Sequence, residues 1–142
     1  MIRLTRRYRF SASHRLHTSA LSESENQALY GKCNNPYGHG HNYILEVSVA
    51  GPIDEQSGLV ARLETLDTLV QSRLIGTLDH RNLNYDVPVF QSKVPTTENL
   101  LEEARRVLSA EWTSAFPNGR PLLAGMRLLE TNRNSVELTT LS

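Results

Sequence analysis

Three histidines lie where their imidazoles could meet on one metal ion. His39 and His41 are two residues apart at the start of a strand-like segment, and alternate residues of an extended chain project to the same side. Gly40 between them has no side chain, so a ligand or another backbone can approach closely. His14 follows an earlier strand-like segment and comes within reach if the two segments pair as a hairpin. Three neutral imidazoles suit Zn²⁺ and leave a fourth position open.

Cys33 is the only cysteine and lies six residues before His39, in a loop rich in Asn, Pro and Gly. Its spacing leaves two roles open: a fourth ligand in a closed structural site, or a nucleophile or base beside an open catalytic one. A nearby dication and Lys32 would both favour the thiolate. The alternative for the histidines is that each is a separately hydrogen-bonded surface residue. The cysteine favours a shared site.

Two other places carry titratable side chains. Asp79 and His80 follow a Gly-Thr break and are either members of a proton relay or loop neighbours without a role. Glu130 shares the alternation of Met126 and Leu128, so it lies at an exposed strand end or is buried for a purpose. A buried carboxylate needs partners, and a ligand with two parallel N–H donors would be one.

The first half of the chain predicts two strands and a long loop. Residues 2–11 alternate between apolar and polar, interrupted only by Arg6 on the apolar face, and residues 41–50 alternate in the same way. A polar loop from residue 18 to residue 39 separates them. A loop of this length in so small a domain is more often functional than not.

The second half predicts two helices and two strands. Helical spacing of apolar residues runs from residue 59 to 76, and a second stripe starts with Thr96 or Thr97 as its N-cap. Strand-like segments follow at 122–131 and 135–141. The order strand, strand, helix, helix, strand, strand predicts an α+β fold, with a four-stranded antiparallel sheet covered on one face by two helices.

The composition excludes several classes of protein. The 142 residues, with 39% hydrophobic and 21% charged, fit one globular domain over residues 1–142. Fifteen basic residues balance fifteen acidic ones, whereas nucleic-acid and membrane-surface binders usually carry a basic excess. One cysteine excludes an intramolecular disulfide framework. Because no segment has the apolar length of a signal peptide or membrane helix, we expect a soluble cytoplasmic protein.

The spacing of these motifs resembles the 6-pyruvoyl-tetrahydropterin synthase family. The resemblance covers nearly the whole chain, and its combined motifs are highly specific. Five segments match in order: FSASHRL at 10–16, LYGKCNNPYGHGHNY at 29–43, LDHRNL at 78–83, PTTEN at 95–99 and LET at 129–131.

The resemblance implies a role for each candidate residue. Three residues would bind Zn²⁺: His14, His39 and His41. A general base and its relay would perform proton transfer: Cys33, His80 and Asp79. Glu130 would anchor the pterin ring and is also one of the implied catalytic residues. Its neighbours in the pterin pocket would be Thr96, Thr97 and Glu98.

The family fold is the tunnelling fold, in which subunits join their sheets into a barrel around a channel. Members are commonly homohexamers made from two trimers, with active sites between subunits. The implied reaction converts 7,8-dihydroneopterin triphosphate to 6-pyruvoyl-tetrahydropterin with loss of triphosphate, a carbon–oxygen lyase step of tetrahydrobiopterin biosynthesis. Three basic residues are candidates to bind the triphosphate: Lys32, Arg15 and Arg133.

The sequence is also compatible with two other functions. The related 6-carboxy-tetrahydropterin synthase of queuosine biosynthesis usually has three residues between its cysteine and the first His of His-Gly-His, and the five residues here favour the pyruvoyl enzyme. A non-catalytic zinc-stabilised assembly module would use Cys33 as a fourth ligand. Two residues depart from the family pattern: Arg62 stands where relatives usually have Asn or Asp before the first helix, and Tyr37 replaces a smaller polar residue.

Overall fold

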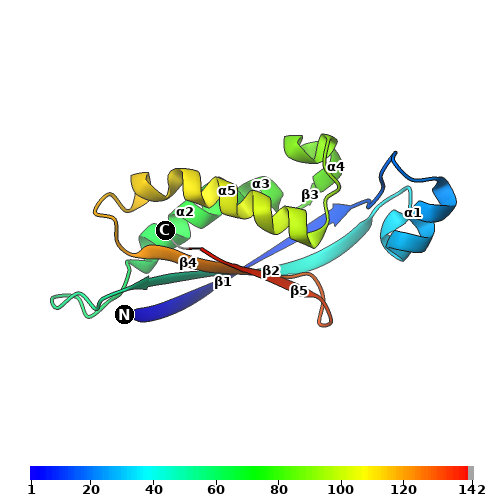
Figure 1. The fold of residues 1–142 in the computed structure, drawn as a ribbon. Coiled ribbons are helices and arrows are strands. Elements are labelled where there is room, and N and C mark those ends of the chain that lie inside the picture. Colours follow the sequence, from blue (N-terminus) through cyan, green and yellow to red (C-terminus); the bar gives the residue numbers. More distant parts are fainter. Residues whose placement is uncertain (141–142) are drawn as a thin grey trace.

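The computed structural model describes residues 1–140 and contains one sheet (Figure 1). Within that range five strands run in the order β3-β1-β2-β4-β5. Their bounds are β1 Ile2–His14, β2 His39–Gly51, β3 Arg81–Asn82, β4 Leu122–Leu129 and β5 Ser135–Thr139. The four longer strands pair in antiparallel fashion, which confirms the predicted sheet.

The predicted strand count of four is corrected to five by β3. This strand pairs in parallel with Ala12 and Ser13 at the end of β1. It consists of only Arg81 and Asn82, which is too short and too polar to show the alternation that identifies a strand in sequence.

The two expected helical segments cover one face of the sheet (Figure 1). The first comprises α2 (Leu63–Val70), a π-helical turn over Gln71–Ile75 and α3 (Gly76–Leu78), and the second is α5 (Thr97–Ala115). Thr96 is the N-cap of α5, as one of the two predicted caps. Arg62 precedes α2 and gives it no side-chain cap, which agrees with the departure noted at this position.

The polar segment between β1 and β2 is not a continuous loop, because it contains α1 (Glu23–Tyr30). Ser22 and Glu25 form a capping box: the Ser22 hydroxyl accepts from Glu25 N, and the Glu25 carboxylate accepts from Ser22 N. A 3-10 turn over Gly31–Asn34 then returns the chain to β2. A second short helix, α4 (Leu83–Asp86), and a 3-10 turn over Pro88–Gln91 lie before α5.

The core lies between the sheet and these helices. β2 contributes Tyr43, Leu45, Val47 and Val49 to it, and the helices contribute leucines that are equally buried. Arg6 also lies on this face of β1, where the apolar pattern is interrupted. Its guanidinium donates to both carboxylate oxygens of Asp67 on α2, at 3.0 and 2.8 Å, and the Tyr8 hydroxyl donates to the same carboxylate at 2.7 Å. The interruption is therefore a polar link between sheet and helix.

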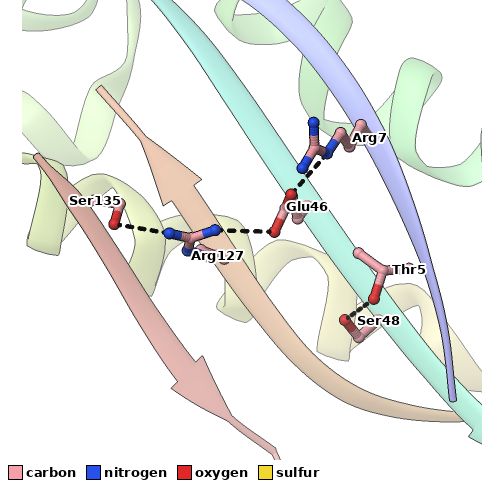
Figure 2. Close-up of polar contacts among 6 residues, drawn as sticks. All are labelled: Thr5, Arg7, Glu46, Ser48, Arg127 and Ser135. Atoms are coloured by element: carbon pink, nitrogen blue, oxygen red, sulfur yellow. Dashed lines mark hydrogen bonds and ion pairs between the residues drawn. The ribbon is translucent and has the colours of Figure 1, made fainter. Parts of the chain in front are cut away.

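The opposite face of the sheet is polar and rich in arginine (Figure 2). Glu46 is only 8% exposed on this face, because the carboxylate lies between Arg7 at 2.7 Å and Arg127 at 3.7 Å. Arg127 also donates to Ser135 on β5. Two guanidiniums thus compensate the burial of one carboxylate, which is the condition under which a buried charge is tolerated.

Candidate active site

Pairing of β1 with β2 brings three potential metal ligands together at one end of the sheet. In the register, His14 lies opposite His39, and Ala12 lies opposite His41. Cys33 joins them from the 3-10 turn, which a hydrogen bond from Leu16 N to Cys33 O fixes beside β1. The ligand atoms of His14, Cys33 and His41 all lie within 4.8 Å of one another, and Cys33 Sγ is 3.9 Å from His41 Nε2.

His39 lies beside this cluster. Its ring centroid is 4.7 Å from that of His41, and the two rings meet edge to face. The group of ligand atoms within 4.8 Å comprises the other two predicted histidines and the cysteine. The structure therefore places all three predicted ligands and Cys33 at one end of the sheet. The sequence spacing did not establish how close Cys33 lies to the histidines.

His14 is held in the tautomer that leaves Nε2 free to bind a metal ion. Its Nδ1 lies 3.0 Å from the carbonyl oxygen of Pro95, and because a carbonyl only accepts, Nδ1 carries the hydrogen. The Nε2 lone pair is buried and has no hydrogen-bond partner anywhere in residues 1–140. Burial, followed by the charge of His41, lowers the pKa of His14 to about 4, so the ring is neutral at physiological pH. This orphaned lone pair beside an imidazole and a thiol fits a Zn²⁺ ion.

The charge state of the remaining cluster depends on burial and on Glu130. Burial lowers the pKa of His41, and the negative charge of Glu130 acts in the opposite direction. Burial, together with Glu130, raises the pKa of the Cys33 thiol. The cysteine is therefore a thiol in the absence of a cation, and a cation in the cluster would favour the thiolate.

Glu130 follows the last residue of β4 and contacts the N-terminal end of α5. Its Oε2 accepts a hydrogen bond of 2.5 Å from the Thr97 hydroxyl, and Thr97 is only 6% exposed. In the part of the chain that the structure describes, Oε1 accepts no hydrogen bond, so one carboxylate oxygen is fixed by the protein and the other is not. Thr96 caps α5 by accepting from Asn99 N, and Glu98 is exposed in the first turn.

Asp79 and His80 lie against the opposite edge of β1. Asp79 Oδ1 accepts from Ser11 N at 2.9 Å, and His80 N donates to Ser11 O at 2.6 Å. His80 has a φ of 58°, rare for a residue with a side chain, and its side chain is 82% exposed. Within residues 1–140 of one chain, no hydrogen bond or ion pair joins His80 to Cys33. A single chain therefore does not assemble the predicted relay.

Of the three candidate triphosphate residues, two lie near each other. Arg15 donates from Nε to Asn34 O, and with Lys32 it lines a hollow of about 590 Å³ next to the 3-10 turn. Arg133 lies in the exposed turn between β4 and β5.

Sequence reasoning missed two groups that orient His14. One is the carbonyl of Pro95, and the other is the buried Tyr43 hydroxyl, 3.3 Å from His14 Nδ1. A backbone carbonyl leaves no trace in residue type. The proline before a helix N-cap was the only available signal.

These features define a class of α+β proteins that carry a candidate metal cluster and a hydrogen-bonded carboxylate at the same end of the sheet. Residues 3–140 match the family model described as 6-pyruvoyl tetrahydropterin synthase. The chain belongs to the 6-pyruvoyl tetrahydropterin synthase family, as its sequence motifs predict. Among residues 1–140, no helix has the length and apolar character needed to cross a membrane.

Individual relatives agree with this assignment. A 6-pyruvoyl tetrahydrobiopterin synthase from Poecilia reticulata is 45% identical over 133 residues, which is 94% of this chain and 86% of the relative. A protein of the same name from Dictyostelium discoideum is 41% identical over 94% of this chain and 92% of the relative. The solved 6-pyruvoyl tetrahydropterin synthase from Caenorhabditis elegans matches with a TM-score of 0.81 and 35% identity, over 99% of this chain and 96% of that one.

Proposed function

We propose that this protein converts 7,8-dihydroneopterin triphosphate to 6-pyruvoyl-tetrahydropterin with elimination of triphosphate. It is then a carbon–oxygen lyase of tetrahydrobiopterin biosynthesis. The observation that carries the proposal is the buried Nε2 lone pair of His14, which lies with His41 and Cys33 beside the Glu130 carboxylate. Family membership and relatives named as this enzyme support it.

Zn²⁺ is the proposed cofactor, held by His14, His39 and His41. When bound, the ion supplies Lewis-acid polarisation of the hydroxyl oxygens on the substrate side chain. Supporting observations are the neutral, tautomer-fixed ring of His14 and the contact between the rings of His39 and His41. Cys33 then stays outside the ligand set and is available as a base.

Cys33 removes the carbon-bound proton of the polarised side chain in this proposal. Proton transfer needs a thiolate, and the raised pKa of the partly buried thiol means that a cation must be nearby to produce one. His80, oriented by Asp79, is the proposed relay that returns protons. The exposed imidazole of His80 is accessible to a second chain.

Glu130 is the proposed anchor of the pterin ring. The exocyclic amino group and the adjacent ring N–H are parallel donors that a carboxylate accepts in a fork. Thr97 fixes the carboxylate from one side, while Thr96 and Glu98 at the start of α5 frame the same pocket. Orientation of the ring decides which side-chain carbon lies at Cys33.

The proposed assembly is a homohexamer of two trimers with active sites between subunits. Within residues 1–140, β1 has a partner at its outer edge only at Ala12 and Ser13, and β5 has none at its outer edge. Long unpaired edges need to be covered, and pairing of β1 with a neighbouring β5 would cover both. In this proposal the relay forms between Cys33 of one subunit and His80 of a neighbour.

The test is product analysis with purified protein and 7,8-dihydroneopterin triphosphate. Triphosphate and the pyruvoyl product are expected, while carboxy-tetrahydropterin with acetaldehyde would identify the queuosine-pathway enzyme instead. A zinc-stabilised assembly module is the second candidate, because Cys33 Sγ lies 3.9 Å from His41 Nε2, close enough for both atoms to bind the same ion. That protein would bind zinc and give neither product. Cys33→Ala serves as the inactive control for the enzymatic reaction.

A further inference from the structure

We infer that Asn99 is a positioning residue that holds the metal-binding half and the pterin-anchoring half of the site in one arrangement. The inference rests on the proposed roles of His14 and Glu130. Asn99 makes hydrogen bonds to neither of them in the described residues. It acts through the short segment Val94–Thr97, which contacts both.

The Pro95 carbonyl is held in one direction by the turn in which it lies. Thr96 N donates to Val94 O at 2.8 Å, which closes a tight turn around Pro95. The proline ring fixes its own φ, and the turn fixes its ψ. The Pro95 carbonyl therefore has one direction, and in that direction it accepts from His14 Nδ1 at 3.0 Å.

Asn99 holds this turn on both sides. Its side-chain Nδ2 donates to Val94 O at 2.8 Å, before the proline, and its backbone N donates to Thr96 Oγ1 at 3.1 Å, after it. Val94 O thus accepts two hydrogen bonds, and one of them comes from the Asn99 amide. Without that amide, Val94 O would accept only the short-range bond from Thr96 N.

The same turn is also connected to Glu130. Thr97 follows Thr96 directly and is buried, and its hydroxyl donates to Glu130 Oε2 at 2.5 Å. A shift of the Val94–Thr97 segment therefore moves the acceptor of the metal ligand and the donor of the ring anchor together. Functional groups need to be held within about 0.5 Å of their working positions, so loosening this segment affects both halves.

Asn99→Asp separates positioning from folding. Residue 99 is in the first turn of α5, where a carboxylate interacts favourably with the helix dipole and the backbone bond to Thr96 is kept. The variant loses only the N–H donor to Val94 O and places an oxygen against that oxygen. We expect its melting temperature to stay close to that of wild type.

We expect Asn99→Asp to bind zinc about 10-fold to 100-fold more weakly in competition with a chelator, the range typical when the group that orients a metal-binding histidine is disturbed. Biopterin affinity, measured at full zinc occupancy, should fall at least several-fold. The Co²⁺-loaded protein should also show a changed absorption spectrum, which reports the geometry of the ligands rather than stability.

Asp54→Ala is the matched control, because Asp54 Oδ2 accepts from Ser57 N in a turn beyond the other end of β2. It should leave both affinities and the spectrum unchanged. Asn99→Ala provides the same measurements if the aspartate variant is not folded by circular dichroism. Zinc and biopterin affinities within twofold of wild type, or loss of only one of them, would overturn the inference. Absence of zinc binding in wild type would instead refute the proposed function.

Discussion

The metal-free protein should lose stability as the pH falls from 7.5 to 4.5, because His14 must remain neutral in a buried site. Burial lowers its pKa in the folded protein to about 4, from an ordinary value of 6.5. Between these values the unfolded chain binds more protons than the folded one, so the free energy of unfolding decreases as the pH decreases. At pH 4.5 the linkage amounts to about 2.5 kcal/mol. The lowered pKa of His41 adds to it with the same sign.

Urea unfolding of chelator-treated protein at pH 7.5 and 4.5 measures this loss. His14→Gln is the control, because the glutamine side chain does not titrate and can still donate to the Pro95 carbonyl. The decrease in wild type should exceed the decrease in His14→Gln by about 2.5 kcal/mol. Equal decreases would mean that the fold does not hold His14 neutral, and would contradict a fixed tautomer with a free Nε2.

Three further predictions concern single side chains. Cys33→Ala should keep its zinc and lose turnover, whereas loss of zinc would show that the thiol is a ligand. Glu130→Gln should bind biopterin roughly a hundredfold more weakly at unchanged zinc content, because a donor then faces a donor; equal affinities would make it a surface residue. Asp67→Asn removes the charged acceptor of Tyr8 and should lower the free energy of unfolding by about 1 kcal/mol through the weaker Tyr8 hydrogen bond, because an exposed ion pair such as that of Arg6 contributes little. An unchanged urea midpoint would show that this link contributes nothing.

Features set by local sequence were predictable. Alternation of apolar residues identified β1 and β2, and the threonine pair at 96–97 located the N-cap of α5 to within one residue. The capping box of Ser22 and Glu25 was equally local, but the surrounding polar residues favoured a loop interpretation of α1.

Features set by distant partners were not predictable. Arg6 interrupts the apolar face of β1 for no reason visible in the sequence, because its partner Asp67 on α2 is 61 positions away. The residue types of the site could be read from the chain, but the orientation of His14 depends on a backbone carbonyl, and residue identity does not encode where a carbonyl points. His80 directly precedes β3, which pairs with the outer edge of β1, and spacing alone does not specify that pairing.

The hairpin of β1 and β2 also has a consequence for the order in which the site is built. His14, His39 and His41 all lie on these two strands, whereas Pro95 is 81 positions beyond His14. Because synthesis proceeds from the N-terminus and short loops close more readily than long ones, the histidines can meet before Pro95 has been made. We expect zinc to be captured loosely by the early hairpin and tightly only after α5 docks. Rapid-mixing refolding with zinc should then show two phases of metal binding. The second phase should coincide with formation of the hydrogen bond between His14 and the Pro95 carbonyl.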